Sequence, residues 1–408
     1  MRHPGRVLLV TSSYPRWEGD STTPFVHHLA QDLRARGWNI LVLAPHAPGA
    51  ARRETLDGVP VERFRYLWPE SLETVCYDGG ALVKLRENRR NLLKIPFLVI
   101  AQWAAILCRI GRHKVCLVHS HWILPQGLTV ALSSGLCGVP HITTIHGSDI
   151  FALRGWTARQ CKRFVLRRAD AVTVNSSATQ AAAEALVPGL SGLVRIAMGA
   201  AVPSQDTEAR AAMLRATYRR NAGPLLIFVG RLVEEKGVSD LLAAIAIVRS
   251  TLPDVTALVV GDGPDRAKYE RQAEQLGIAG IVTFTGWLPS DQVQCHLGAA
   301  DIFVGPSRPA LDGTVEAQGI AFIEAMLAGR PVVATAIGGI ADFVHHNRTG
   351  LIVAAAAPTE IAQAISQLAT DGSMAERLGS EGRRQAMLNH TREVSASRFD
   401  ALYGRVLG

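Results

Sequence analysis

Residues 225–237 read LLIFVGRLVEEKG and contain the turn on which the fold assignment depends. Five consecutive apolar residues, 225–229, are typical of a strand buried on both faces of a parallel sheet. Gly230 ends this strand with a turn, and the apolar spacing over 239–250 predicts a helix. A strand, a glycine-containing turn and a helix make up the repeating unit of a doubly wound α/β domain.

The same alternation of strand and helix extends in both directions from this turn. Toward the C-terminus, apolar runs predict strands at 256–260, 281–284, 302–304 and 331–334. Toward the N-terminus, they predict strands at 7–10, 39–44, 115–119, 141–145 and 171–174. The chain is therefore predicted to be an α/β protein with two Rossmann-like, doubly wound parallel-sheet domains, whose strands end at a ligand-binding cleft.

The length of 408 residues agrees with this division, because one hydrophobic core seldom grows beyond about 300 residues. The stretch 199–223 shows little periodicity and is interpreted as the linker. We therefore predict an N-terminal domain at 1–205 and a C-terminal domain at 206–390.

Charge is distributed unevenly between the two halves. Residues 1–205 contain 24 Lys and Arg against 13 Asp and Glu, a net charge of +11 within a chain total of +8. A basic half is compatible with nucleic acid, anionic lipid or a phosphorylated ligand. No basic motif with interleaved aromatic residues occurs, so nucleic acid is not expected as a partner.

The segment from Lys84 to Lys114 combines basic and apolar residues. Its apolar stretch, 95–108, is flanked by the basic residues Lys84, Arg86, Arg89, Arg90, Lys94, Arg109, Arg112 and Lys114. This pattern fits an interfacial helix on anionic lipid or, alternatively, a buried helix with basic ends. The stretch is shorter than the about 20 residues that span a bilayer, and no signal-peptide pattern precedes it. The expectation is a cytoplasmic protein with peripheral contact at the inner face of the membrane.

Two strand-end segments carry candidate ligand-binding residues. Arg231 and Lys236 place two positive charges in the turn after 225–229, which suits a diphosphate; the alternative is a turn with solvated charges. In the segment 312–334, Gly319 precedes a predicted helix whose first N–H groups form an anion site. Glu316 and Glu324 offer carboxylates that can accept hydrogen bonds from sugar diols, whereas the alternative for Glu324 is an exposed helix position.

These motifs resemble the retaining nucleotide-sugar glycosyltransferases of family 4, the "glycosyl transferases group 1". The resemblance rests on the Glu316 and Glu324 spacing, the Gly230-Arg231 and Lys236-Gly237 pairs, and the run EAMLAGRPVVA at 324–334. SSYP at 12–15, HSHW and PQG within 119–127, and TIHGSD at 144–149 extend it over nearly the whole chain. It implies the GT-B architecture, two Rossmann-like domains facing each other across a cleft, with a C-terminal helix at 391–408 that crosses back onto the N-terminal domain.

The resemblance also implies an activity. A sugar would move from a nucleotide-diphosphate donor, most frequently a UDP-sugar in this family, to an acceptor hydroxyl, with retention of anomeric configuration. The acceptor would be a sugar, a lipid-linked sugar or a small molecule, in glycan, polysaccharide, glycolipid or glycosylated-metabolite biosynthesis. A nucleotide-sugar 2-epimerase of the same fold and a non-catalytic nucleotide- or solute-binding protein are the alternatives.

Roles for single residues follow from the same resemblance. Arg231 and Lys236 would bind the diphosphate, Glu316 the donor sugar and Glu324 the ribose. His146 would face the donor sugar from the N-terminal domain, completing a catalytic group of Glu316, His146, Arg231 and Lys236. Gly19 would lie beside the diphosphate and Leu288 near the base, and donor-binding backbone would come from Gly230, Gly319, Ile320 and Ala321.

Some positions depart from the family pattern. Gln318 stands where many relatives have a large apolar residue, and we interpret it as a contact to the donor sugar. No Asp-x-Asp sequence occurs, and the histidine pairs lack carboxylate or cysteine companions at ligand spacing. No metal or other cofactor is therefore expected.

Overall fold

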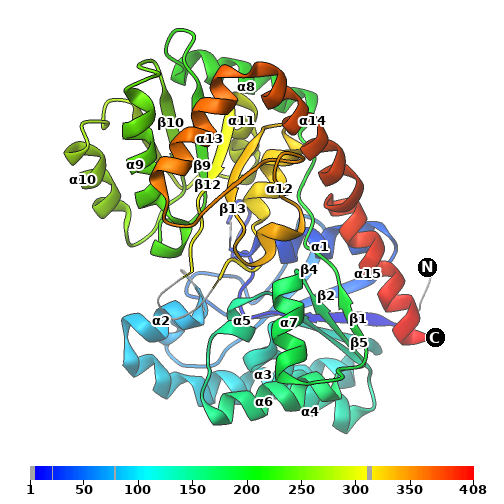
Figure 1. Ribbon diagram of the computed structural model, residues 1–408. Helices are drawn as coiled ribbons and strands as arrows, with labels where there is room; N and C mark the ends of the chain where they lie inside the picture. The colour runs from blue at the N-terminus through cyan, green and yellow to red at the C-terminus, as the bar shows by residue number, and fades with distance from the viewer. Residues whose placement is uncertain (1–4, 21, 78–79, 310–314) are drawn as a thin grey trace. The chain divides into compact units, whose positions relative to one another are not determined.

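The computed structural model describes residues 5–20, 22–77, 80–309 and 315–408, which form two compact units (Figure 1). Unit 1 comprises Met1–Ala197 together with Ser395–Gly408, and unit 2 comprises Met198–Val394. Each unit is built on one largely parallel sheet with connecting helices, which confirms the predicted class of two Rossmann-like domains.

The sheet of unit 1 has eight strands in the order β3-β4-β2-β1-β5-β6-β7-β8. These strands are β1 (Arg6–Val10), β2 (Asn39–Pro45), β3 (Arg53–Leu56), β4 (Val59–Phe64), β5 (Val115–His121), β6 (His141–Ile145), β7 (Ala171–Val174) and β8 (Leu193–Arg195). All neighbouring pairs are parallel except the hairpin of β3 and β4. The sequence pattern missed the edge strands β3 and β8, and also β4, which pairs with β3, because polar residues interrupt these strands and none contains a long apolar run.

Helices cover both faces of the first sheet. They are α1 (Pro24–Ala35), η1 (Glu70–Leu72), α2 (Ala81–Glu87), η2 (Arg89–Lys94), α3 (Ile95–Arg112), η3 (Ile123–Gly127), α4 (Leu128–Cys137), α5 (Ser148–Phe151), α6 (Trp156–Arg168), α7 (Ser177–Leu186) and most of α15 (Arg392–Leu407). Leu8 and Val10 of β1 pack in one core cluster with residues of α3 and α4. On the other face, α15, red in Figure 1, lies against the sheet, where the Tyr403 hydroxyl is 2.6 Å from Nδ1 of His119.

The sheet of unit 2 has six parallel strands in the order β11-β10-β9-β12-β13-β14. They are β9 (Leu225–Val229), β10 (Thr256–Val260), β11 (Val282–Gly286), β12 (Ile302–Gly305), β13 (Val332–Thr335) and β14 (Leu351–Val353). The connecting helices are α8 (Gln205–Tyr218), η4 (Glu234–Lys236), α9 (Val238–Arg249), α10 (Arg266–Gln275), α11 (Ser290–Ala299), α12 (Ile320–Leu327), η5 (Gly338–Asp342), α13 (Pro358–Thr370) and α14 (Gly372–Asn389). Alternate residues of β9 enter two separate core clusters, so the strand is buried on both faces as its apolar run predicts.

The interpretation of residues 199–223 as a linker is wrong, because this stretch contains α8. This helix packs against α11, and Ala211 lies so close to Gly298 that a Cβ added to the glycine would stand 2.9 Å from the alanine Cβ. Ala211 is the one buried residue of α8, and the sequence of this helix accordingly shows almost no apolar periodicity. The structural boundary falls at Ala197 and Met198, where we had placed the division at 205 and 206.

The chain passes between the units twice, and the two crossing segments are bonded to each other. The N–H of Ala200 donates to the carbonyl of His390 at 2.9 Å, and the N–H of Arg392 donates to the carbonyl of Ala200 at 3.0 Å. Beyond the second crossing, Ser395–Gly408 belongs to unit 1, where Trp38 Nε1 donates to Asp400 at 2.9 Å.

Candidate active site

The candidate donor site lies at the point where the strand order of unit 2 reverses direction. From β9 the chain proceeds to β10 on one side and later to β12 on the other, so the carboxyl ends of β9 and β12 flank the switch point. Open α/β sheets bind ligands at such points. A Cβ added to Gly237, in the loop after β9, would stand 1.9 Å from the carbonyl oxygen of Pro306, in the loop after β12. Only glycine permits this close approach, which brings the two loops together.

The centre of the site is an ion pair between Lys236 and Glu316, from those two loops. Nζ of Lys236 bonds to Oε2 of Glu316, and both side chains are largely buried. The backbone of Glu316 is fixed as well, because its carbonyl accepts from the N–H of Gly339 at 3.0 Å. The structure thus brings together two residues that the sequence separates by eighty positions and that we had assigned to the diphosphate and the sugar.

Beside this pair, α12 presents its N-terminus and one further carboxylate. Gly319 has φ 82° as the N-cap, and it leaves the N–H groups of Ile320 and Ala321 without a helical acceptor. Glu324 follows about one turn later and is half-buried, and its carboxylate accepts no hydrogen bond from a described residue. Burial raises the pKa of Glu324 to about 7. A carboxylate that is poorly hydrated and unpaired is a ready acceptor for ligand hydroxyl groups.

The remaining predicted residues of unit 2 lie in neighbouring strand-end loops. The N–H of Gly230 donates to the carbonyl of Val260 at 3.0 Å, which joins the loops after β9 and β10. The guanidinium of Arg231 is half-exposed and lies 3.9 Å from Glu235, so the structure does not bring it into contact with Lys236 or Glu316. Leu288 follows β11 and packs against the core.

Gln318 does not have the role that we assigned to it. Its buried side-chain amide forms two hydrogen bonds with the backbone of Met198: the amide accepts from the N–H at 2.9 Å and donates to the carbonyl at 2.6 Å. Both polar atoms of the amide are therefore occupied within unit 2. The interpretation of Gln318 as a sugar contact is wrong, and the residue instead ties the Glu316 loop to the start of the unit.

Arg308 is a positioning residue that the sequence did not reveal. It follows β12, its N–H donates to the carbonyl of Glu235 at 2.9 Å, and its guanidinium donates to the carbonyl and the carboxylate of Glu234. These bonds fix the short turn η4 that ends in Lys236. A single arginine after a strand forms no sequence motif. Its position after β12, at the switch point, is the one feature of the sequence that could have indicated this role.

In unit 1, His146 follows β6 and belongs to a cluster of rings. Nε2 of His146 is 2.9 Å from Nδ1 of His121, and the rings of Phe25 and Trp122 lie within 5.0 Å of the His146 ring. Burial lowers the pKa of His146 well below its ordinary value, and the neighbouring His121 lowers it further. A neutral imidazole of this kind can exchange hydrogen bonds with a ligand but carries no positive charge at neutral pH.

Asp149 holds this cluster in place. Its carboxylate accepts from the N–H groups of Ile123, His146 and Gly147 at 2.8 to 3.1 Å, which connects the loops after β5 and β6. Burial raises its pKa, although these bonds stabilise the charged form. We had quoted Asp149 within a motif without giving it a role, and its place after a glycine with φ 115° marks a side-chain-bonded turn.

Gly19 lies in the loop after β1 and is exposed, with φ 83°. The loop is closed by Asp20, which accepts from the backbone N–H and from Nε of Arg16 at 2.9 and 2.8 Å. Nothing lies within 4 Å of a Cβ added to Gly19, so its backbone is open to a ligand.

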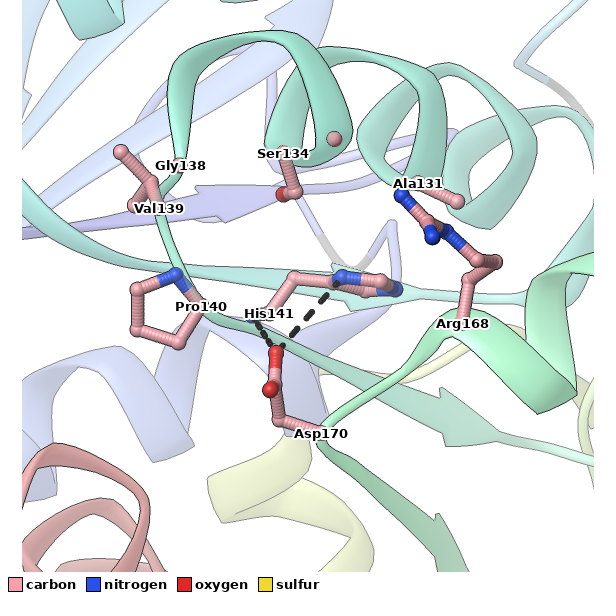
Figure 2. Close-up of a pocket in the computed structure, with 9 residues that line it drawn as sticks. Ala131, Ser134, Gly138, Val139, Pro140, His141, Arg168 and Asp170 are labelled. Carbon is pink, nitrogen blue, oxygen red and sulfur yellow. Dashed lines mark hydrogen bonds and ion pairs between the residues drawn. The ribbon is translucent and has the colours of Figure 1, made fainter.

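A polar pocket of about 450 Å³ lies elsewhere in unit 1 (Figure 2). Figure 2 shows Arg168 and Asp170 on either side of His141, whose backbone N–H donates to Asp170 at 2.8 Å. The pocket is at the amino end of β6, whereas His146 follows the carboxyl end. None of the predicted site residues lines it, so it is separate from the candidate active site.

Within the described ranges, no three His, Cys, Asp or Glu side chains are grouped so as to hold a metal ion. The positive groups of the candidate donor site are instead Lys236, Arg231 and the N-terminus of α12.

Family models match both halves of the chain. The one described as "Glycosyl transferases group 1" matches residues 213–385, and the one described as "Glycosyl transferase 4-like domain" matches residues 22–199.

Two curated proteins illustrate the sequence similarity. The GDP-mannose-dependent alpha-(1-6)-phosphatidylinositol monomannoside mannosyltransferase of Mycobacterium tuberculosis is 34% identical over 391 residues, which cover 93% of this chain and 92% of that protein. The 2-deoxystreptamine glucosyltransferase of Streptomyces kanamyceticus is 30% identical over 263 residues, covering 61% of this chain and 66% of that protein.

Solved structures share the fold. Sucrose-phosphate synthase from Thermosynechococcus elongatus has a TM-score of 0.76 at 22% identity, covering 98% of this chain and 99% of that chain. HepE of Anabaena in complex with UDP and glucose has a TM-score of 0.75 at 20% identity, covering 98% and 100%.

Proposed function

Because this chain belongs to the group 1 glycosyltransferases and has their GT-B fold, we propose that it is a retaining enzyme that transfers a sugar from a nucleotide-diphosphate sugar to an acceptor hydroxyl. The observation that carries the proposal is the joining of Lys236 and Glu316 at the β9/β12 switch point, beside the N-terminus of α12. At the carboxyl ends of these strands, the cationic and N–H groups suit a diphosphate, and the carboxylate suits the hydroxyl groups of the sugar bonded to it.

In the proposed complex, each group acts on one part of the donor. Lys236 and Arg231, with the N–H groups of Ile320 and Ala321, take the diphosphate. Glu316 exchanges its bond with Lys236 for the hydroxyl groups of the transferred sugar, and Glu324 accepts from the two hydroxyl groups of the ribose. Gly230 and Leu288, in the loops after β9 and β11, take the nucleoside side of the ligand.

The chemistry assigned to these residues is electrostatic. Negative charge develops on the leaving diphosphate as the glycosidic bond breaks, and fixed positive groups stabilise it without reorganisation. The leaving phosphate accepts the proton of the attacking hydroxyl on the same face, which retains the anomeric configuration. His146 is neutral and serves as a polar contact to the donor sugar, and Gly19 lies beside the diphosphate. Since protein groups supply the positive charge, we propose that transfer needs no metal ion, and activity should be unchanged in EDTA.

The donor base is open to direct test. Family frequency favours a UDP-sugar, whereas the mycobacterial relative carries GDP-mannose in its name. A screen of UDP-, GDP-, ADP- and dTDP-sugars by thermal unfolding should find one class that raises the Tm. Product analysis with sugar and lipid-linked acceptors then identifies the transfer. The absence of stabilisation by every nucleotide sugar would contradict the proposed function.

A control separates ligand binding from general charge effects. Glu324→Gln should reduce the Tm shift caused by the best donor, whereas Lys268→Ala, on the exposed face of α10, should leave it unchanged. Donor turnover in the absence of any acceptor, yielding an epimerised nucleotide sugar, would instead favour the 2-epimerase.

A further inference from the structure

The segment η2 to α3 of unit 1 leaves a large apolar surface uncovered. Arg89–Arg112 is the one helical segment of the described residues long and apolar enough to cross a membrane, yet only 28% of its apolar window is buried. Leu93, Phe97 and Ile100 are 75%, 57% and 63% exposed. A core helix would bury these side chains, so a different surrounding must account for them.

The exposed residues of α3 form a single stripe. Phe97, Ile100 and Ala104 are spaced by three and four residues, which places them on one face of the helix. No charged residue occurs between Lys94 and Arg109, so this face is entirely apolar over about 10 Å from Phe97 to Ala104, and Leu93 precedes it by about one turn.

The opposite face fixes α3 to its own unit. Leu98 and Ile106 are buried in the core, and Nε2 of Gln102 donates to Oγ1 of Thr129 on α4 at 2.5 Å. Nε of Arg109 bonds to Glu62 at 2.8 Å, so this arginine does not belong to the exposed basic group we had assigned it to. A helix held in this way by one face leaves only its outer face free for a partner.

Cationic side chains flank the stripe at both ends. Arg89 and Arg90 precede it, Arg112 and Lys114 follow it, and all four are exposed without an ion pair to a described residue. Lys94 lies at the start of α3, where its Nζ donates to Thr74 Oγ1 at 3.0 Å.

We propose that this apolar stripe and its basic ends form a docking surface for an anionic lipid bilayer, with α3 lying flat at the interface. The apolar residues insert at the boundary of head groups and acyl chains, and the cations contact lipid phosphates. A second copy of the chain fits less well, because either way of pairing α3 with another α3 opposes cationic ends. This inference does not depend on the proposed transfer reaction.

Cosedimentation of the full chain with vesicles tests the surface. We expect binding to vesicles of phosphatidylcholine with 30% phosphatidylglycerol, weak binding to pure phosphatidylcholine, and loss of binding as salt rises. Phe97→Ser combined with Ile100→Ser should weaken binding at least about tenfold. Arg89→Glu with Arg90→Glu should weaken it by a similar factor in low salt and by less in high salt.

Met213→Ser is the matched control, because Met213 is 73% exposed on α8 of unit 2. It should bind vesicles like the wild type. Every variant is first checked without vesicles. An unchanged Tm shows that the fold is intact, and an unchanged donor-induced Tm shift shows that the donor site is intact.

Three results would overturn the inference. The first is that the wild type does not bind anionic vesicles. The second is that the Phe97→Ser/Ile100→Ser variant binds vesicles like the wild type. The third is that the wild type is a dimer in sedimentation velocity and the same variant is a monomer with unchanged vesicle binding. Loss of the donor shift with intact vesicle binding would count against the proposed transfer reaction alone.

Discussion

The strand-end residues of the two units differ in what they bond to. In unit 2, Glu324 has no hydrogen-bond partner among the described residues, and the first N–H groups of α12 lack a helical acceptor. In unit 1, the polar residues bond to one another: His119 to Tyr403, His121 to His146, and Tyr14 to His27, which is bonded to Asp57. Unit 2 therefore presents polar groups that a ligand can use, while most of those in unit 1 stabilise the unit itself.

This difference explains why motifs indicate the donor and not the acceptor. A diphosphate and a ribose are common to UDP-, GDP- and ADP-sugars, so residues that bind them recur in fixed patterns. In unit 1 the free polar capacity lies in loop backbone, such as that of Gly19, and in surface charge. The specificity for an acceptor then depends on features that have no short motif.

The largest effect is expected where the unit 2 site is broken at its centre. Lys236→Ala removes a fixed positive charge next to the leaving diphosphate, and Glu316→Ala removes the acceptor for sugar hydroxyls. Each should lower kcat by about 10³-fold, measured with the donor found in the screen, while the circular dichroism spectrum is unchanged. A rate within tenfold of the wild type would remove that residue from the catalytic group.

The next effect concerns Gln318, whose role is structural. Gln318→Ala leaves the N–H and the carbonyl of Met198 without their buried partners, which should lower the free energy of unfolding by about 2–3 kcal/mol. Chemical denaturation measures this loss. Since the side chain does not contact the sugar, the ratio of kcat/KM between two donor sugars should stay as in the wild type. If Gln318→Ala changed this kcat/KM ratio while its stability stayed normal, the interpretation of Gln318 as a sugar contact would be correct after all.

Glu324 should make donor binding depend on pH. Its pKa of about 7 means that the carboxyl group is mostly protonated at pH 6 and mostly ionised at pH 8. The ionised form accepts both ribose hydrogen bonds, so the Kd of the nucleotide sugar should fall about tenfold between these values. Isothermal titration calorimetry on wild type and Glu324→Gln checks this, because the variant should show a flat profile.

The same group has the opposite effect on the stability of the free protein. A pKa raised on folding stabilises the folded state fully below the ordinary pKa of a glutamate, and this contribution disappears as pH rises through about 7. Glu324→Gln should therefore gain Tm relative to the wild type at pH 8 and lose this advantage at pH 5. An equal Tm difference at both pH values would contradict the assigned pKa.

The smallest effect is expected from unit 1. Tyr403→Phe removes the hydroxyl bonded to the buried His119 and should lower the free energy of unfolding by about 1–2 kcal/mol. Donor affinity, which we assign to unit 2, should be unaffected. A matched change at Tyr218, which is not fully buried on α8, should cost less.

Much of the fold was predictable because the buried strands carry uninterrupted apolar runs. Strands such as β9 and β10 begin and end where expected, whereas α8 was missed because its one fully buried residue leaves no periodic pattern. At the site, the turn residues around Lys236 and the helix start at Gly319 were visible from spacing. The bonds of Gln318 and Arg308 were not, because they join residues from distant loops.

The ion pair between Lys236 and Glu316 has a consequence for the end of the proposed reaction. In the free protein Lys236 and Glu316 bond to each other. When the proposed donor enters, this bond is replaced by one from Lys236 to the diphosphate and one from a sugar hydroxyl to Glu316. Once the sugar has moved to the acceptor, Glu316 loses its ligand and is again available to Lys236. The re-forming pair competes with the spent nucleoside diphosphate for the same ammonium group. In the proposed reaction, Lys236 and Glu316 would thus assist product release, and nucleotide inhibition should be weaker than the number of phosphate contacts suggests.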